Sequence, residues 1–236
     1  EIMPSLVGSE MCIRDRTKAK FKLRPILQAC ANGSSELMSN ISGSVVGIVY
    51  NFQLLKYLGE NGISAYGVLM YVQFIFIAIF VGYSIGCAPV VSFHFGAGNH
   101  SELQSLLKKS TRIVGSLSII LTVLALTLAN PLAKMFVGYD VELLAITSHA
   151  FKIFSFSFLL AGFNIFASSF FTALNNGVIS AAISFLRTLI FQTSSVLILP
   201  LILSVDGLWG ANVAAEIFAF VISLAFLVAN RKKYHY

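Results

Sequence analysis

Long uninterrupted runs of apolar residues are the feature that most limits what this chain can fold into. Each of six runs is long enough to cross a hydrocarbon core of about 30 Å, which takes about 20 helical residues. They cover residues 26–55, 64–93, 113–131, 149–173, 179–203 and 207–230. A backbone in lipid must satisfy its own hydrogen bonds, and these runs are continuous rather than alternating. They therefore predict transmembrane helices and not barrel strands.

The composition leads to the same class of protein. Of the 236 residues, 57% are hydrophobic and 11% are charged, whereas an ordinary soluble domain has about 25% charged residues. The chain lacks the polar side chains needed to cover a soluble surface, so we expect an all-α, polytopic membrane protein. Its cysteines, Cys12, Cys30 and Cys87, have no metal-ligand spacing, and we expect neither a metal site nor a disulfide framework.

The chain divides into four predicted parts. Residues 1–16 resemble translated adapter sequence and are interpreted as non-native, with the rest truncated at this end; the alternative is a short native cytoplasmic segment. Residues 17–25 form a basic cytoplasmic linker, residues 26–230 the six-helix region, and residues 231–236 a basic tail. Turn residues predict short loops at residues 59–62, 96–99, 175–177 and 206–207, and a longer loop is expected at residues 131–142.

Basic residues indicate how the helices are oriented. One cluster precedes the first run, one follows the second run, and one follows the sixth. They cover residues 18–24, 108–112 and 231–233. With six spans all three clusters lie on one side, which the positive-inside rule makes the cytoplasm. We therefore expect a multi-pass protein of the cell membrane with both ends cytoplasmic. The formal charge of +6 is attributed to this rule, and no nucleic-acid partner is expected. The segment KAKFKLR is also compatible with an anionic-lipid site.

Three ionisable side chains lie within the apolar runs, where charge is costly and often functional. They are Glu36, Arg187 and Glu216. Arg187 and Glu216 enter the bilayer from opposite faces, and helical rise puts them within about 5 Å of each other in depth. We predict a buried ion pair, which would serve either as a clamp between helices or as part of a binding site.

Glu36 has no basic side chain at its predicted depth. It lies in a polar stretch of small residues, CANGSSELMSN, which can line a water-filled cavity. Glu36 is therefore a candidate proton or cation carrier; the alternative is a glutamate that hydrogen-bonds to serines and only fixes packing. Asn40 and Asn164 are weaker candidates, because neutral polar side chains in membranes usually hydrogen-bond between helices.

Catalytic motifs do not occur in the sequence. It contains no GxSxG, no HExxH and no phosphate-binding GxxxxGK[ST], and its histidines are scattered at positions 94, 100, 149 and 235. We expect no cofactor and no enzymatic activity.

Residues 82–99, GYSIGCAPVVSFHFGAGN, resemble the signature that closes the second helix of each half of the multidrug and toxic compound extrusion (MATE) transporters. The shared positions are Gly82, Gly86 and Pro89, followed by a turn with Gly96, Ala97 and Asn99. The spacing of Gly82 and Gly86 also favours close helix packing. The stretches FLRTLIF and GLWGANVAAE agree with the family as well, so the resemblance covers nearly everything after about residue 24.

The resemblance implies that the chain is the carboxy-terminal six-helix lobe of a twelve-helix, pseudo-symmetric exporter whose amino-terminal lobe is missing. Family members export lipophilic or cationic small molecules in exchange for Na⁺ or H⁺ by alternating access. Some members bind a cation with a Glu and an Asp in this lobe. The matching positions here carry Gly43 and Asn164, so neither family carboxylate is retained.

Three alternatives remain open at this stage. A lipid-linked sugar flippase of the same superfamily would need several basic residues at mid-bilayer depth, and only Arg187 qualifies. A non-transporting membrane scaffold would show no response to coupling ions. A membrane enzyme would need clustered catalytic groups at one boundary.

Overall fold

The computed structural model describes residues 23–234 and residue 236. Within this part, the side chains of residues 24, 25, 28, 31, 32 and 34–36 are not described. The predicted non-native segment 1–16 and most of the predicted basic linker 17–25 therefore lie outside the described residues.

The described residues form helices joined by short turns and contain no strand, as the apolar runs predict. In chain order the elements are α2 (Leu23–Gly96), α3 (His100–Val137), α4 (Val141–Ser155), α5 (Phe158–Ala173), α6 (Gly177–Phe185), the π-helical η1 (Leu186–Gln192) and α7 (Thr193–Tyr234). Three helical segments among them are long and apolar enough to cross a membrane. The pair α4 and α5, bent by 50°, would be a fourth.

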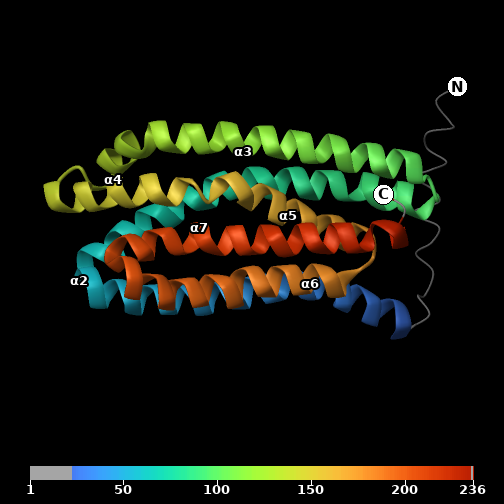
Figure 1. The fold of residues 1–236 in the computed structure, drawn as a ribbon, viewed down its shortest axis with the longest axis horizontal. Coiled ribbons are helices and arrows are strands. Elements are labelled where there is room, and N and C mark those ends of the chain that lie inside the picture. The colour runs from blue at the N-terminus through green and yellow to red at the C-terminus, as the bar shows by residue number, and fades with distance from the viewer. Residues whose placement is uncertain (1–22, 235) are drawn as a thin grey trace, which may run out of the picture.

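Two of the long helices reverse direction at a single non-helical residue (Figure 1). In α2 this residue is Gly59, with φ 64° and ψ −149°, a conformation that glycine adopts without a Cβ penalty. The turn predicted at residues 59–62 is thus confirmed. In α7 the reversal is at Ser204, with φ 53°, a value that is unusual for a residue with a side chain. The turn predicted at Asp206 and Gly207 is wrong, because both lie in the helix that follows the break.

The predicted turns before α3 and before α6 are confirmed. Gly98 has φ 68°, and Asn99 then caps α3 by accepting a hydrogen bond from the Glu102 N–H at 3.2 Å. Before α6, Asn175 has φ 58°, and Asn176 caps the helix by accepting from the Ile179 N–H. Asparagine suits both tasks, because its short side chain tolerates the left-handed region and competes for backbone donors.

The long loop predicted for residues 131–142 is wrong. Helix α3 continues through Pro131 to Val137, and α4 begins at Val141 with Asp140 as its N-cap. Proline lacks the N–H that a helix uses, but it is tolerated in membrane helices where neighbouring groups compensate.

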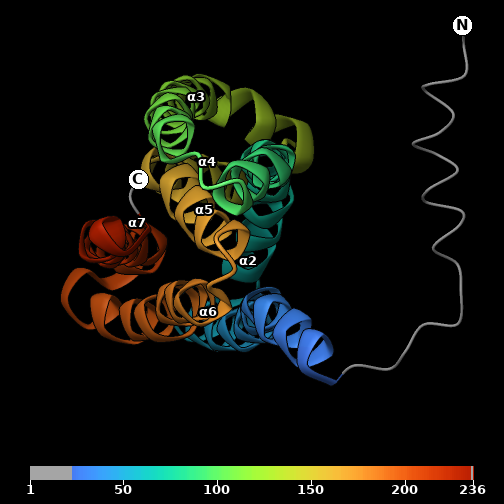
Figure 2. The same cartoon turned by 90° about the vertical axis from the view of Figure 1, so that its right-hand side faces the viewer.

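Helix α5 lies at the centre of the bundle (Figure 2). A glycine lets it approach its neighbours closely: a Cβ at Gly162 would lie 2.4 Å from Phe80 Cε1 in α2 and 2.9 Å from Ser118 Oγ in α3. Within the described residues, no close packing occurs at Gly82 and Gly86, because a Cβ at either position would have no atom within 4 Å. Both glycines lie on an exposed face of α2.

The two ends of the bundle differ in charge. Figure 1 shows the reversals within α2 and α7 at one end, and the start of α2 and the carboxyl terminus at the other. The basic residues 108–112 and 231–233 belong to the latter end, near the start of α3 and the end of α7.

Large apolar side chains are exposed on the surface of the bundle, among them Phe74 (79%) and Leu201 (74%). An apolar exterior of this kind is suited to contact with lipid.

Candidate functional site

A polar cluster with two buried members and one half-buried member joins three helical elements and contains the ion pair predicted from the sequence. We call Asn164 of α5, Arg187 of η1 and Glu216 of α7 the Arg187 cluster. Arg187 Nη2 donates to Glu216 Oε1 at 2.6 Å, and Arg187 Nε lies 3.0 and 3.1 Å from the two carboxylate oxygens. The predicted pair between Arg187 and Glu216 is confirmed.

Asn164 completes the cluster from α5. Its side chain is fully buried, and its amide nitrogen donates to Glu216 Oε2 at 2.7 Å and to the Glu216 backbone oxygen at 3.1 Å. The hydrogen bond between helices that was predicted for Asn164 is therefore present. The amide oxygen of Asn164 is buried, and among the described residues it has no hydrogen-bond partner.

The electrostatics of the cluster favour a fixed arrangement. The side chains of Arg187 and Glu216 are 19% and 5% exposed, so either charge alone would carry a large desolvation cost. The guanidinium and carboxylate compensate each other through more than one hydrogen bond, the strongest geometry that this pair offers. While Arg187 stays in place, the Glu216 oxygens are occupied.

Arg187 lies in a π-helical segment, Leu186–Gln192, which was not predicted from the sequence. The residues LRTLIFQ include neither glycine nor proline, so the sequence carries no local signal for the change in helix type. π-helical turns are rare and occur frequently at functional sites. At the far end of η1, Gln192 Nε2 donates to Asn212 Oδ1 at 2.9 Å.

One face of α7 makes a polar contact at each of three successive turns. The backbone oxygen of Leu208 accepts from the Tyr50 hydroxyl of α2 at 3.1 Å. Asn212 pairs with Gln192, and Glu216 binds the rest of the Arg187 cluster. Asn212 was not predicted either, although its position four residues before Glu216 puts both on one helix face. These contacts tie α7 to α2, η1 and α5.

The remaining candidates lie elsewhere in the fold. Glu36 is within α2, and its side chain lies outside the described residues. Asn40 is exposed on the same helix, so the structure brings together three of the five candidate binding residues. Among the family-signature positions, Pro89 is exposed within α2, and Gly96, Ala97 and Asn99 lie at the turn into α3. The described residues contain no group of three or more His, Cys, Asp or Glu side chains that could hold a metal ion.

Comparison with known protein families finds a match. The model of the MatE family matches residues 36–198, more than half of the chain. The comparison with curated proteins found no match.

Solved structures share the fold at low sequence identity. An outward-facing multidrug resistance MATE family transporter of the MOP superfamily has a TM-score of 0.84 and 17% identity. The match covers 93% of this chain and 49% of the chain of that transporter. A mutant of the Vibrio cholerae MATE transporter VcmN has a TM-score of 0.83 and 17% identity over 97% of this chain and 53% of its own.

A third structure, a MOP superfamily transporter from Pyrococcus furiosus, has a TM-score of 0.79 and 19% identity, over 94% of this chain and 49% of its own. The chain thus spans about half the length of the solved structures that it matches.

Proposed function

Because the chain belongs to the MatE family, we propose that it forms one six-helix lobe of a twelve-helix exporter of lipophilic or cationic small molecules. The observation that carries the proposal is the match of nearly the whole chain to about half of each solved transporter. A half-length match over a continuous fold is expected when one of two similar lobes is present.

The breaks in α2 and α7 support six membrane crossings. Residues 23–58 and 60–96 flank Gly59, and residues 177–203 and 205–234 flank Ser204. Each of these segments exceeds the roughly 20 residues that a crossing needs. With α3 and the bent pair α4–α5, they make six. Under the positive-inside rule, the basic end of the bundle is cytoplasmic and both ends of the chain lie inside the cell.

We infer that the missing lobe packs on the exposed face of α2 that carries Gly82 and Gly86. Glycines on a helix surface allow another backbone to approach closely, and at both positions the space for such an approach is open. The central cavity would then have one wall from each lobe. For this reason a single lobe is not expected to transport by itself.

The mechanism we propose is alternating access by rocking of the two lobes, coupled to Na⁺ or H⁺. The Arg187 cluster would act as a clamp that keeps α5, η1 and α7 together while the lobe moves as a unit. Glu36 would carry the coupling ion in this lobe. A membrane potential supplies about 2.3 kcal/mol per charge per 100 mV, enough to bias a two-state lobe equilibrium tens-fold.

The flippase alternative is less well supported. It needs several basic residues at mid-bilayer depth, and the one that qualifies, Arg187, is paired with Glu216.

The proposal is tested by dye efflux from a host that lacks its own drug pumps. We expect efflux from cells that produce the whole transporter, and none from cells that produce this lobe alone. Glu36→Gln in the whole protein is expected to reduce efflux and drug resistance, because an amide cannot carry the coupling charge. Glu60→Gln removes an exposed acid from the same helix and serves as the matched control. Efflux by the isolated lobe would refute the two-lobe mechanism, and full resistance with Glu36→Gln would remove that residue's proposed role.

A further inference from the structure

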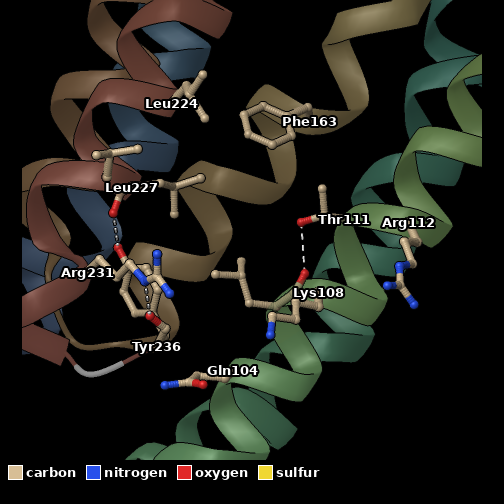
Figure 3. Close-up of a pocket in the computed structure, with 11 residues that line it drawn as sticks. Gln104, Lys108, Thr111, Arg112, Phe163, Leu224, Leu227, Arg231 and Tyr236 are labelled. Atoms are coloured by element: carbon tan, nitrogen blue, oxygen red, sulfur yellow. Dashed lines mark hydrogen bonds between the residues drawn. The ribbon is translucent and has the colours of Figure 1, made fainter.

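A groove between α3 and α7 shares no lining residue with the Arg187 cluster and has a volume of about 500 Å³ (Figure 3). Apolar side chains from three helices form its walls: Leu107 of α3, Phe163 of α5, and Leu224, Leu227 and Val228 of α7. Leu224 and Val228 are exposed there, so the groove offers apolar surface that is not covered by the described residues.

Three basic side chains also line the groove, Lys108 and Arg112 from α3 and Arg231 from α7. None of them forms an ion pair with an acidic side chain in the described part of the chain. Arg231 Nε donates to the backbone oxygen of Tyr236 at 3.3 Å, which leaves its other N–H groups for a further acceptor. Lys108 and Arg231 approach the groove from opposite sides (Figure 3).

We propose that this groove binds one anionic phospholipid, with the phosphate between Lys108 and Arg231 and an acyl chain along Leu224 and Phe163. The charge selects the headgroup, because three basic side chains and no acidic side chain of the described residues line the groove; they attract a net negative group and repel the lipophilic cations that the central cavity would transport. The apolar walls select a ligand with a hydrocarbon tail over a free anion, because burying that tail removes apolar surface from water.

The position of the groove agrees with this ligand. Its basic residues lie at the end of the bundle that the proposed topology makes cytoplasmic, and anionic lipids are concentrated in that leaflet. The choice of leaflet rests on the proposed topology. Binding itself requires neither that topology nor transport, so failure of the efflux experiment and failure of this proposal are distinguishable.

The test is native mass spectrometry of the full chain in detergent, titrated with phosphatidylglycerol or phosphatidylcholine of the same acyl chains. We expect one phosphatidylglycerol to bind preferentially. The double variant Lys108→Gln/Arg231→Gln should weaken its binding about thirtyfold, which corresponds to about 2 kcal/mol for two basic residues near an anionic headgroup. The matched control is Lys109→Gln/Lys232→Gln, which removes the same charge from neighbouring positions that do not line the groove. It should bind as the parent does.

A second measurement reports on the groove directly and keeps the proposal testable if the double variant is poorly produced. In the Phe163→Trp variant, phosphatidylglycerol with brominated acyl chains should quench the emission added to that of the parent, whose one tryptophan is Trp209, more than brominated phosphatidylcholine does. Equal binding or quenching by the two lipids would overturn the proposal, as would an equal loss of affinity in the two double variants. Competition by glycerol 3-phosphate as strong as that by the intact lipid would also overturn it, because the site would then bind a free anion.

Discussion

Replacing Glu216 by glutamine is expected to lower the free energy of unfolding by about 3 kcal/mol, because it leaves the half-buried Arg187 guanidinium without its counter-charge. The side chain of Arg187 is 19% exposed, and its guanidinium donates hydrogen bonds to the Glu216 carboxylate. For a chain of this size the loss corresponds to a decrease of about 10 °C in the melting midpoint. Thermal unfolding of the purified chain in detergent micelles measures it.

Two further variants show whether this effect comes from an unpaired charge. The double variant Arg187→Met/Glu216→Leu replaces both partners with apolar residues and so leaves no unpaired charge. Its melting midpoint should be higher than that of the Glu216→Gln single variant. The exposed pair of His149 and Asp206, whose side chains are 58% and 59% exposed, provides the control. There, Asp206→Asn should cost less than about 1 kcal/mol. The Arg187 cluster would not be a clamp if the melting midpoint of Glu216→Gln lay within about 2 °C of the parent's, which corresponds to less than about 1 kcal/mol.

The second large effect is expected from Gly207→Ala. A Cβ at this position would lie 2.4 Å from the Leu199 backbone oxygen and 2.8 Å from the Pro200 nitrogen. These atoms belong to the chain just before the Ser204 break, and backbone cannot move aside as a flexible side chain can. We expect a loss of about 2–3 kcal/mol from overpacking, measured by the same thermal unfolding.

Gly210→Ala is the matched control for this prediction. It lies on the same helix one turn later, and its Cβ would have Ile153 Cγ2 as its nearest neighbour at 4.0 Å. Alanine is the better helix former by about 1 kcal/mol, so this variant should be neutral or slightly more stable than the parent. If the two alanine variants unfolded at the same temperature, the close contact at Gly207 would not exist.

The depth of a residue along the bundle could be predicted from the sequence, but the neighbouring helix that its side chain would contact could not. Arg187 and Glu216 were paired by helical rise alone, because two residues at equal depth in adjacent segments can meet. The contact of Asn164 with Glu216 depends on α5 lying at the centre of the bundle, and no local pattern encodes that placement. The same reasoning applies to Gly82 and Gly86. Their spacing favours close packing, but it does not indicate which surface packs against them.

Chain reversals were predictable where glycine or asparagine provides the left-handed conformation. This holds for Gly59, Gly98 and Asn175. At Ser204 the reversal falls on a residue with a Cβ, two residues before the Asp206 and Gly207 pair that the sequence favours. The close approach of Gly207 to Leu199 explains why the glycine is needed there: it allows the chain to fold back after the break instead of forming the break itself.

Accessibility of the two chain reversals in intact cells tests the six-crossing topology on which the exporter proposal depends. Single cysteines at positions 60 and 205 are introduced after Cys12, Cys30 and Cys87 are replaced by alanine, with cysteines at positions 101 and 232 as cytoplasmic controls. Six crossings with both ends inside predict that a membrane-impermeant maleimide labels positions 60 and 205 in intact cells, and positions 101 and 232 only after the membrane is permeabilised. If position 60 or 205 reacted only after permeabilisation, the proposed topology would be wrong, and the two-lobe exporter with it.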